Sequence, residues 1–265
     1  MEAVLQELLS WVKDIQIDQW GVAYLVLIFP IAVSFYFDLQ LHREMLVVSV
    51  RATLQLILIA LILLPVFQSH WSIQISLIAA MLFMGAVVAR ERGKRVPKAF
   101  AIALLSMIIS YGAVIFVFLI TGALEIIPNI VIPISGMLIG NASRTISLNF
   151  HKTYNDFDTH KAMLEAMMID GAEYSQAVRV PSQYTLKTAL VPRIDSLKTL
   201  GIVHIPGAMA GMMVAGASPL AAAGYQILIF FGIVSISALS SIVANTLGYR
   251  SVFVTTYPHL KRMGW

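Results

Sequence analysis

The sequence predicts an all-α protein that crosses a membrane about seven times. Hydrophobic residues make up 58% of its 265 residues and charged residues only 12%, whereas about 25% of the residues in soluble domains are charged. One water-soluble core could not bury so many apolar side chains. The apolar residues also gather in stretches of about 20, the length that a helix needs to cross a bilayer.

Seven stretches have this length and composition, and short polar linkers separate most of them. In chain order they are Trp20–Phe37, Met45–Phe67, Trp71–Ala89, Ala99–Thr121, Ile127–Phe150, Leu200–Ala217 and Leu220–Leu247. The fifth stretch also contains Pro133, Gly140 and Arg144. We therefore leave open whether its helix is continuous or is broken and partly exposed to water.

The remaining residues divide around these stretches. Residues 1–19 are acidic and amphipathic and lack the basic start of a signal peptide, so we expect a helix that lies on the membrane surface. Residues 20–247 form the predicted transmembrane domain, whose one long loop covers about residues 151–199. Residues 248–265 form a short basic tail.

The distribution of Lys and Arg predicts the orientation. Most basic residues fall in the linker RERGKRVPK after the third stretch, in the long loop and in the C-terminal tail. Linkers rich in Lys and Arg face the cytoplasm. We therefore expect a multi-pass protein of the cell (inner) membrane, in contact with lipid, with its N-terminus outside and its C-terminus in the cytoplasm.

The long loop contains the sequence EAMMIDGA, which runs from Glu165 and Ala166 to Gly171 and Ala172. Because glycine readily adopts the left-handed conformation at a helix end, the pattern predicts a helix, a tight turn and a second helix that returns toward the membrane through Pro192. This layout resembles the coupling loop of ABC-transporter permeases. The resemblance assigns contact with an ATP-binding subunit to Glu165, Ala166, Gly171 and Ala172. The alternative is an ordinary amphipathic cytoplasmic helix.

The chain carries no signature of an enzyme. It lacks the GxxxxGK[ST] motif of a P-loop nucleotide site, so ATP and Mg are expected on a partner subunit and no cofactor on this chain. It has no cysteine, which excludes disulfides and thiol catalysis. No nucleic-acid motif is present, and membrane topology accounts for the basic residues.

Polar and thioether groups gather in the fifth, sixth and seventh stretches. The candidates for lining a transport pathway are Asn141, Ser143, Met209, Met213 and Gln226. Thioethers can bind soft metals, but methionines in membrane helices more often pack against neighbours. The alternative is therefore that all five residues only pack, and no metal-ligand set is defined.

Four further polar residues are interpreted as structural. Arg51 and Gln55 lie four residues apart and therefore on one helix face, with Arg51 reaching toward the cytoplasmic surface. Arg144 is expected near the inner face of the membrane. Asn245 is expected to form a hydrogen bond between helices.

Several segments together resemble one known family. They are RATLQL, PISGMLIGN, EAMMIDGA and VPRIDSLKTLGIVHIPGAMAGMMVAGASPLAAAGYQI, followed by a short basic C-terminus. The similarity is to the FetB-type permeases, an iron-export ABC permease family with aluminium-tolerance permeases among its plant members. It covers the chain from about Asp38 onward. It implies a permease homodimer that binds separate ATP-binding subunits and exports iron or another metal for metal homeostasis.

Two departures from the family pattern fall in the expected pathway. In the family, the residue that corresponds to Asn141 is usually followed by Ser or Ala, then Met, then Asn, whereas here it is followed by Ala, Ser and Arg. The family's usual Pro-Gly-Met-Met-Thr-Gly reads PGAMAG here, from Pro206 to Gly211. Arg193 is a further departure, within the family's Pro-Ile-Asp stretch. The substrate therefore stays open among iron, another metal, a metal chelate and an organic ligand.

Two other classes of protein remain as alternatives. An ATP-independent secondary transporter or channel should carry acidic residues inside its membrane helices, whereas Asp38, Glu44 and Glu125 lie at the edges of the predicted stretches. A membrane anchor or regulator that transports nothing has no need of the polar, glycine-rich tract.

Overall fold

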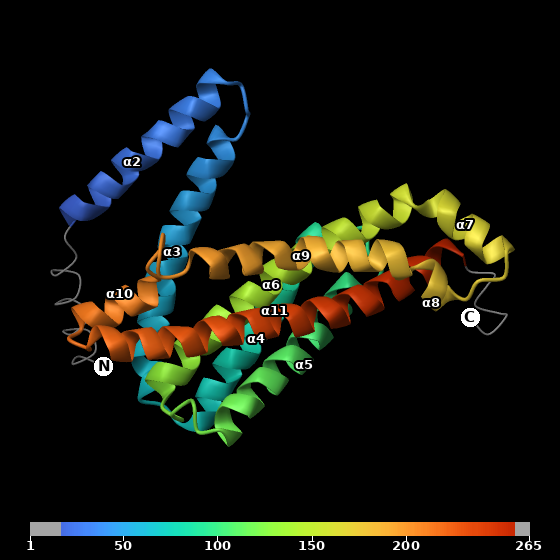
Figure 1. Ribbon diagram of the computed structural model, residues 1–265. Helices are drawn as coiled ribbons and strands as arrows, with labels where there is room; N and C mark the ends of the chain where they lie inside the picture. The colour runs from blue at the N-terminus through green and yellow to red at the C-terminus, as the bar shows by residue number, and fades with distance from the viewer. Residues whose placement is uncertain (1–16, 258–265) are drawn as a thin grey trace. The chain divides into compact units, whose positions relative to one another are not determined.

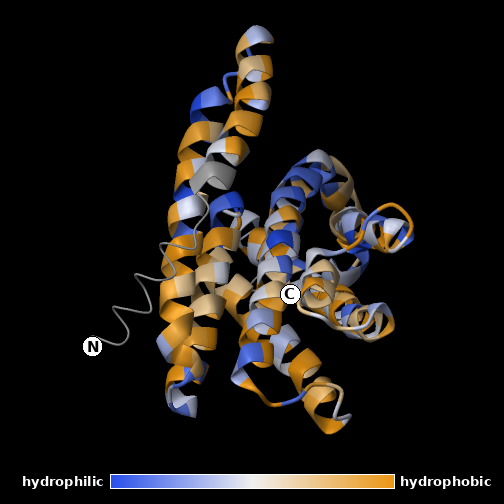
Figure 2. Ribbon diagram, turned by 90° about the vertical axis from the view of Figure 1, so that its left-hand side faces the viewer, coloured by the Kyte–Doolittle hydropathy of each residue, from blue (hydrophilic) through white to orange (hydrophobic). Residues whose placement is uncertain are grey.

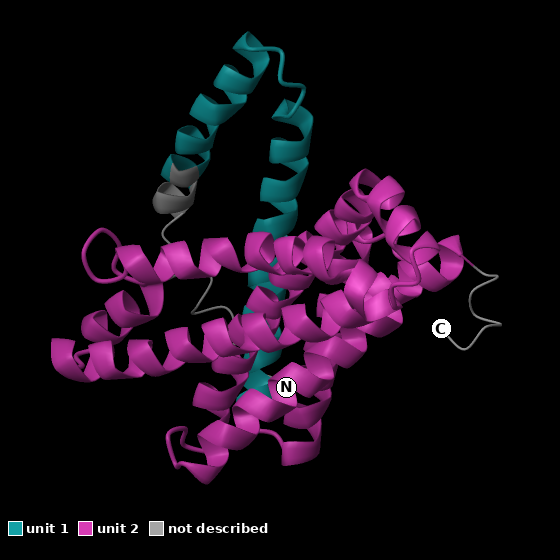
Figure 3. Ribbon diagram, turned by 45° about the vertical axis from the view of Figure 1, so that its right-hand side comes forward, with its two compact units in different colours: residues 1–68 teal, residues 69–265 magenta. Residues whose placement is uncertain are grey.

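The computed structural model describes the backbone of residues 17–257 (Figure 1). Most of the expected surface segment at residues 1–19 and the end of the tail therefore lie outside the described residues. The chain divides into two compact units, residues 1–68 and 69–265 (Figure 3). The described residues are helical apart from turns and one isolated bridge between Leu200 and His204, which confirms the all-α prediction.

The first unit is a pair of helices, α2 (Ile17–Tyr36) and α3 (His42–Phe67). In the turn between them, Asp38 and Gln40 have positive φ angles. The Leu41 amide donates a hydrogen bond of 3.2 Å to the hydroxyl of Ser34, which closes the turn. These two helices correspond to the first two predicted stretches.

The second unit is built around four long helices. They are α4 (Trp71–Arg92), α5 (Ala99–Ile120), α6 (Pro128–Thr159) and α11 (Pro219–Thr256). Small residues let these helices approach closely. A Cβ atom on Gly232 of α11, for example, would lie 2.8 Å from Phe118 Cζ of α5.

Much of the helical ribbon of this bundle is hydrophobic (Figure 2), and many of its large apolar side chains are exposed. On α5 alone, Leu105, Ile108, Ile109, Phe116 and Val117 are all exposed. So much exposed apolar surface is unfavourable in water and favourable in lipid. Helices α3, α4, α5 and α11 are each long and apolar enough to cross a membrane, and the described part of α2 forms a shorter apolar helix over Tyr24–Tyr36.

The fifth predicted stretch is one continuous helix. Helix α6 runs through Pro133 without a break and contains 32 residues. At 1.5 Å per residue it is about 48 Å long, more than the roughly 30 Å of the hydrocarbon core. It therefore extends past Phe150, where the predicted stretch ends, to Thr159.

The sixth predicted stretch, Leu200–Ala217, is not a single membrane-spanning helix. A turn containing Gly201, with a φ of +77°, interrupts it, and only α10 (Gly207–Val214) is helical. Eight residues of helix span about 12 Å, too short to cross a bilayer. The count of seven apolar spans is accordingly not confirmed in the described residues, since α3, α4, α5 and α11 alone meet the criterion.

The segment expected as a long loop is largely helical. It holds the end of α6, then α7 (Lys161–Ile169), α8 (Tyr174–Ala177) and α9 (Arg179–Thr199). Helix α9 packs against α6 and α11, and Figure 1 shows it lying alongside α11.

Candidate functional site

Two features of the second unit are candidates for function: a helical hairpin at one end of α9 and a polar cavity near its other end. The hairpin consists of α7, the turn at Gly171 and α8. The cavity lies among α6, α9, α10 and α11. We describe the hairpin first.

The turn of the hairpin forms because Gly171 adopts the predicted left-handed conformation, with a φ of +86°. Its amide donates to the carbonyl oxygen of Met168 at 3.1 Å, and the Ala172 amide donates to that of Met167 at 2.9 Å. These two bonds are the Schellman arrangement that satisfies the last carbonyls of a helix. An L-residue with a side chain would cost about 1–2 kcal/mol in this conformation.

The start of α8 is also capped. The side chain of Gln176 accepts a hydrogen bond of 3.0 Å from the Glu173 amide, and the Glu173 side chain accepts one from the backbone of Gln176. This capping box satisfies orphan donors at the helix start. Local sequence therefore specifies both sides of the turn.

Aromatic and polar contacts attach the hairpin to the ends of α6 and α11. The Tyr257 hydroxyl donates a hydrogen bond of 3.0 Å to Glu165 Oε1. Burial, together with the hydrogen bond to Glu165 and the charge of that residue, raises the pKa of Tyr257 to about 12. The ring of Tyr174 packs edge-on against Phe253, with centroids 4.7 Å apart.

The tip of the hairpin, in contrast, is open to solvent. Ile169 is 85% exposed, and Ala166, Asp170 and Gly171 are also exposed. Of the four residues assigned to coupling, Ala166 and Gly171 face outward, whereas Glu165 and Ala172 are half-buried. The tip thus presents small residues, the carboxylate of Asp170 and one large apolar side chain, that of Ile169.

Buried hydrogen bonds join the three helices that lead away from the hairpin. Thr185 of α9 donates to Asp156 Oδ2 of α6 at 2.7 Å and lies 2.8 Å from the Tyr249 hydroxyl of α11. Because the single proton of Thr185 goes to the carboxylate, Tyr249 is the donor of the second bond. Asn245 of α11 also donates to the Ser182 hydroxyl of α9 at 2.6 Å.

The cavity has a volume of about 250 Å³. Its lining comes from α6, α9, the turn after α9, the start of α10 and the first half of α11. The residues are Met137, Asn141, Arg193, Ser196, His204, Pro206, Gly207, Ala208, Gln226, Ile229, Phe230, Ile233 and Val234.

A pair of hydrogen bonds fixes the charged group of the cavity. Arg193 Nη1 donates to Asn141 Oδ1 at 2.6 Å. The Asn141 amide nitrogen in turn donates to the carbonyl oxygen of Met137 at 2.7 Å. Helix α9 therefore carries a half-buried guanidinium whose position is set by α6.

Gln226 has a different environment. It is 5% exposed, and among the described residues its Oε1 atom has no hydrogen-bond partner. A buried acceptor without a partner costs about 1–3 kcal/mol. Gln226 also lines the cavity, so a turn of its amide would bring this oxygen to a bound molecule that donates a hydrogen bond.

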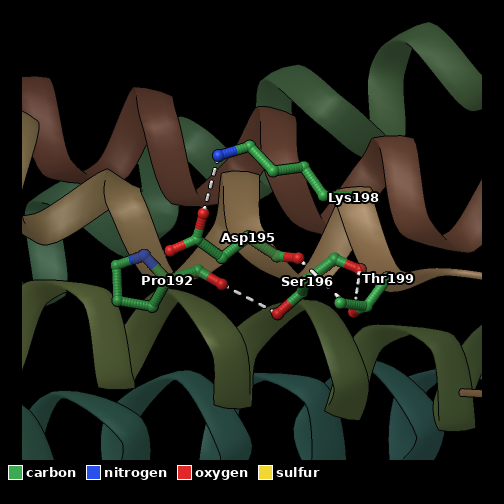
Figure 4. A network of polar contacts seen from close by, with 5 residues as sticks. All are labelled: Pro192, Asp195, Ser196, Lys198 and Thr199. Carbon is green, nitrogen blue, oxygen red and sulfur yellow. Dashed lines mark hydrogen bonds and ion pairs between the residues drawn. The ribbon is translucent and has the colours of Figure 1, made fainter. Parts of the chain in front are cut away.

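The acidic residue closest in sequence to Arg193 is paired outside the cavity. Asp195 forms a 2.9 Å ion pair with Lys198, and Figure 4 shows these two side chains pointing toward one another on α9. Ser196 Oγ donates to the carbonyl oxygen of Pro192 at 2.8 Å. Among the described residues that line the cavity, none is Asp or Glu.

The structure brings together two of the five predicted pathway residues, Asn141 and Gln226. Ser143 instead donates a hydrogen bond of 2.7 Å to the carbonyl oxygen of Gly85 on α4. Met209 and Met213 lie on α10, and the cavity lining does not include them.

The four residues interpreted as structural lie in different places. Arg144 is exposed on α6, and Asn245 joins α11 to α9 as described above. Arg51 and Gln55 lie on one exposed face of α3 among apolar neighbours.

Sequence reasoning missed Arg193, Ser196 and His204 as cavity residues. The sequence predicts a cytoplasmic loop at Arg193 and Ser196, because this segment is too polar to be recognised as part of the helix bundle. One feature of the sequence could have indicated a shared site for Arg193 and Ser196. These two polar residues are three positions apart, which places both on one face of a helix.

The comparisons with known proteins cover nearly the whole described chain. The family model described as "Uncharacterised protein family (UPF0014)" matches residues 17–253. The chain is 30% identical to the "Probable iron export permease protein FetB" of Escherichia coli over 89% of its own length and 92% of that protein. No solved structure matches it.

Two further relatives match this chain over a similar share of its length. The "Protein ALUMINUM SENSITIVE 3" of Arabidopsis thaliana is 32% identical over 89% of this chain and 87% of its own length. The "UPF0014 membrane protein YjkA" of Bacillus subtilis is 30% identical over 85% of this chain and 90% of its own. Together with the apolar helices, these matches show a multi-pass membrane protein, and the chain belongs to the UPF0014 family.

Proposed function

We propose that this chain is the permease subunit of an ABC exporter and that a separate ATP-binding subunit drives it. The observation that carries the proposal is the hairpin at Gly171, which is attached to α6 and α11 on one side and exposes its tip on the other. A partner that moved this tip would act directly on the helices that line the cavity.

The position of the basic residues supports a cytoplasmic hairpin. Ser251 near the end of α11 donates a hydrogen bond of 2.7 Å to the carbonyl oxygen of Pro97, and the Arg95 guanidinium lies 5.2 Å from the centre of the Tyr154 ring on α6. The basic linker after α4 is therefore at the same end of the second unit as the hairpin. By the positive-inside rule that end faces the cytoplasm, with the C-terminus on the same side and the N-terminus outside.

Helix α9 then has the place of the missing sixth span. Its contacts run from Ser182 and Thr185, opposite the second half of α11, to Arg193, opposite the middle of α6. Its 21 residues are about 30 Å long, which matches the hydrocarbon core. Its polar side chains suit a helix that faces protein and a water-filled pathway rather than lipid.

The arrangement of the hairpin and helices α6, α9 and α11 supports the following transport mechanism. Two permease chains bind two ATP-binding subunits, which hold the ATP and Mg. Closure of the ATP-binding subunits moves the hairpins, and the hydrogen bonds of Asp156, Thr185 and Tyr249 transmit the movement to α6, α9 and α11. The cavity then changes the side to which it opens, and the permease itself forms and breaks no covalent bond.

The relative named as a probable iron export permease suggests iron or another metal as cargo and a role in metal homeostasis. A secondary transporter is less well supported, because no Asp or Glu lines the described cavity to serve as a proton or sodium site.

The test uses the exposed tip. Ile169→Glu changes an 85% exposed residue of the hairpin, and Ile202→Glu is a matched control that changes an 86% exposed residue beyond the far end of α9. We expect Ile169→Glu to weaken co-purification of the ATP-binding subunit and to lower transport, at unchanged thermal stability. Equal effects of the two variants, or none, would contradict a docking role for the tip.

A further inference from the structure

The cavity at the far end of α9 has a charge that is unexpected for a metal exporter. Its charged and titratable lining groups are the Arg193 guanidinium and the His204 imidazole. The described residues include no group of three or more His, Asp or Glu side chains that could hold a metal ion. Hard cations prefer several oxygen ligands, usually carboxylates, so this cavity disfavours a bare metal ion.

The guanidinium has unused binding capacity. Arg193 carries five N–H donors, and its one hydrogen bond to the described residues goes to Asn141. The guanidinium is half-buried, and an anion would offset the cost of holding its charge away from water. Arginine is the side chain best suited to bind a carboxylate or phosphate through two parallel hydrogen bonds.

Gln226 adds a second requirement. The residue is 5% exposed and lines the cavity, and its Oε1 atom has no hydrogen-bond partner among the described residues. Turning the amide toward the cavity would let this oxygen accept a hydrogen bond, which a hydroxyl group supplies and a simple carboxylate does not. Met137, Phe230 and Ile233 provide an apolar wall. The volume of about 250 Å³ is below the roughly 300–1,000 Å³ of sites for drug-sized ligands, so the ligand is small.

We propose that this cavity binds a small organic anion that carries both a carboxylate and a hydroxyl group, the chemistry of a hydroxycarboxylic acid. Arg193 binds the carboxylate and Gln226 accepts the hydroxyl hydrogen. The inference rests on the proposed export function, and it specifies that a metal leaves this cavity as an anionic complex rather than as a free ion.

The experiment measures binding to the purified full-length permease in lipid nanodiscs without the ATP-binding subunit. Calorimetric titrations in the absence of oxygen compare citrate, ferrous ion in a non-coordinating buffer, and the ferrous citrate complex. We expect citrate or its ferrous complex to bind and ferrous ion alone not to bind. Binding of both anions would identify the acid as the recognised part, whereas binding of the complex alone would identify the chelate as the ligand. Binding of ferrous ion alone, or of no probe, would overturn the proposal.

Two substitutions test the sign of the cavity charge. Arg193→Gln removes the positive charge, and Gln226→Glu adds a negative charge with little change in shape. Each should weaken anion binding at least tenfold, whereas a cation site would bind its ion more tightly after either change. The control is Lys198→Gln on an exposed face of the same helix, which should leave the affinity unchanged.

The thermal stability of each variant is also measured, so that a loss of binding can be distinguished from a loss of folding. Arg193→Lys, which keeps the positive charge, should recover part of the affinity that Arg193→Gln loses. Unchanged anion affinity in both Arg193→Gln and Gln226→Glu would refute the proposal. Because the ATP-binding subunit is absent from this assay, its outcome is independent of whether the hairpin docks such a subunit.

Discussion

The hydroxyl group of Thr185 is predicted to be a main link between the three helices that join the hairpin to the cavity. Thr185→Val keeps the shape of the side chain and removes the hydroxyl. Asp156 Oδ2 then loses a hydrogen bond of 2.7 Å and the Tyr249 hydroxyl loses one of 2.8 Å. All three residues are buried, at 8%, 0% and 1% exposure for Asp156, Thr185 and Tyr249, so water cannot readily replace either bond.

The magnitude follows from the two lost bonds. A hydrogen bond to a charged group contributes about 1.5–3 kcal/mol and a neutral one about 0.5–1.5 kcal/mol. Their sum predicts a loss of about 2–4.5 kcal/mol in the free energy of unfolding. Thr188→Val is the matched control on the same helix. Within the described part of the chain the Thr188 hydroxyl bonds only to the carbonyl oxygen of Tyr184 one turn earlier, so this change should cost less than about 0.5 kcal/mol.

The assay is reversible denaturation of the reconstituted permease, followed by the ATPase activity of the assembled complex. We expect Thr185→Val to lower both the stability and the stimulation of ATP hydrolysis by substrate, with Thr188→Val close to the original protein. If the two variants are equally stable, the buried network does not hold the helices together. If Thr185→Val loses stability but keeps full stimulation, the network does not transmit movement from the hairpin.

Three further predictions concern packing, titration and topology. Gly232→Val should destabilise the bundle by about 1–3 kcal/mol, because a Cβ atom there would lie 2.8 Å from Phe118 Cζ; an unchanged melting temperature would show that the helices are farther apart. The pKa of Tyr257 is raised to about 12, above its ordinary value of about 10, so its contribution to stability is present below pH 10 and is lost between about pH 10 and 12. Tyr257→Phe should remove that loss and the matching step in phenolate absorbance, and it should loosen the hairpin by cutting the bond to Glu165. A cysteine at Ser218 of this cysteine-free chain should react with an impermeant reagent applied from outside, and labelling only from the cytoplasm would reverse the proposed orientation.

Local sequence was sufficient for the features that depend on neighbouring residues. The helices α3, α4 and α5 follow apolar stretches because a helix in lipid must satisfy its own backbone groups. The left-handed turn at Gly171 could likewise be predicted, since it depends on the absence of a Cβ atom.

Hydropathy failed where continuity and tertiary contacts decide the structure. Leu200–Ala217 is apolar enough for a span, but Gly201 and Pro206 interrupt it, because average hydropathy says nothing about breaks in a helix. Helix α9 is too polar to be recognised as part of the bundle, and its contacts with α6 and α11 hold it there.

The cavity depended most on the tertiary structure. Asn141 could be proposed as a pathway residue from the polar tract around it, and Gln226 from its place inside an apolar stretch. Arg193 is 52 residues from Asn141 in the chain. The two residues come together with Gln226 because α9 packs against both α6 and α11. Separate helices contribute the positive charge, its amide partner and the unpaired acceptor, and no local pattern encodes their distance, since it is set by buried side chains along all three helices.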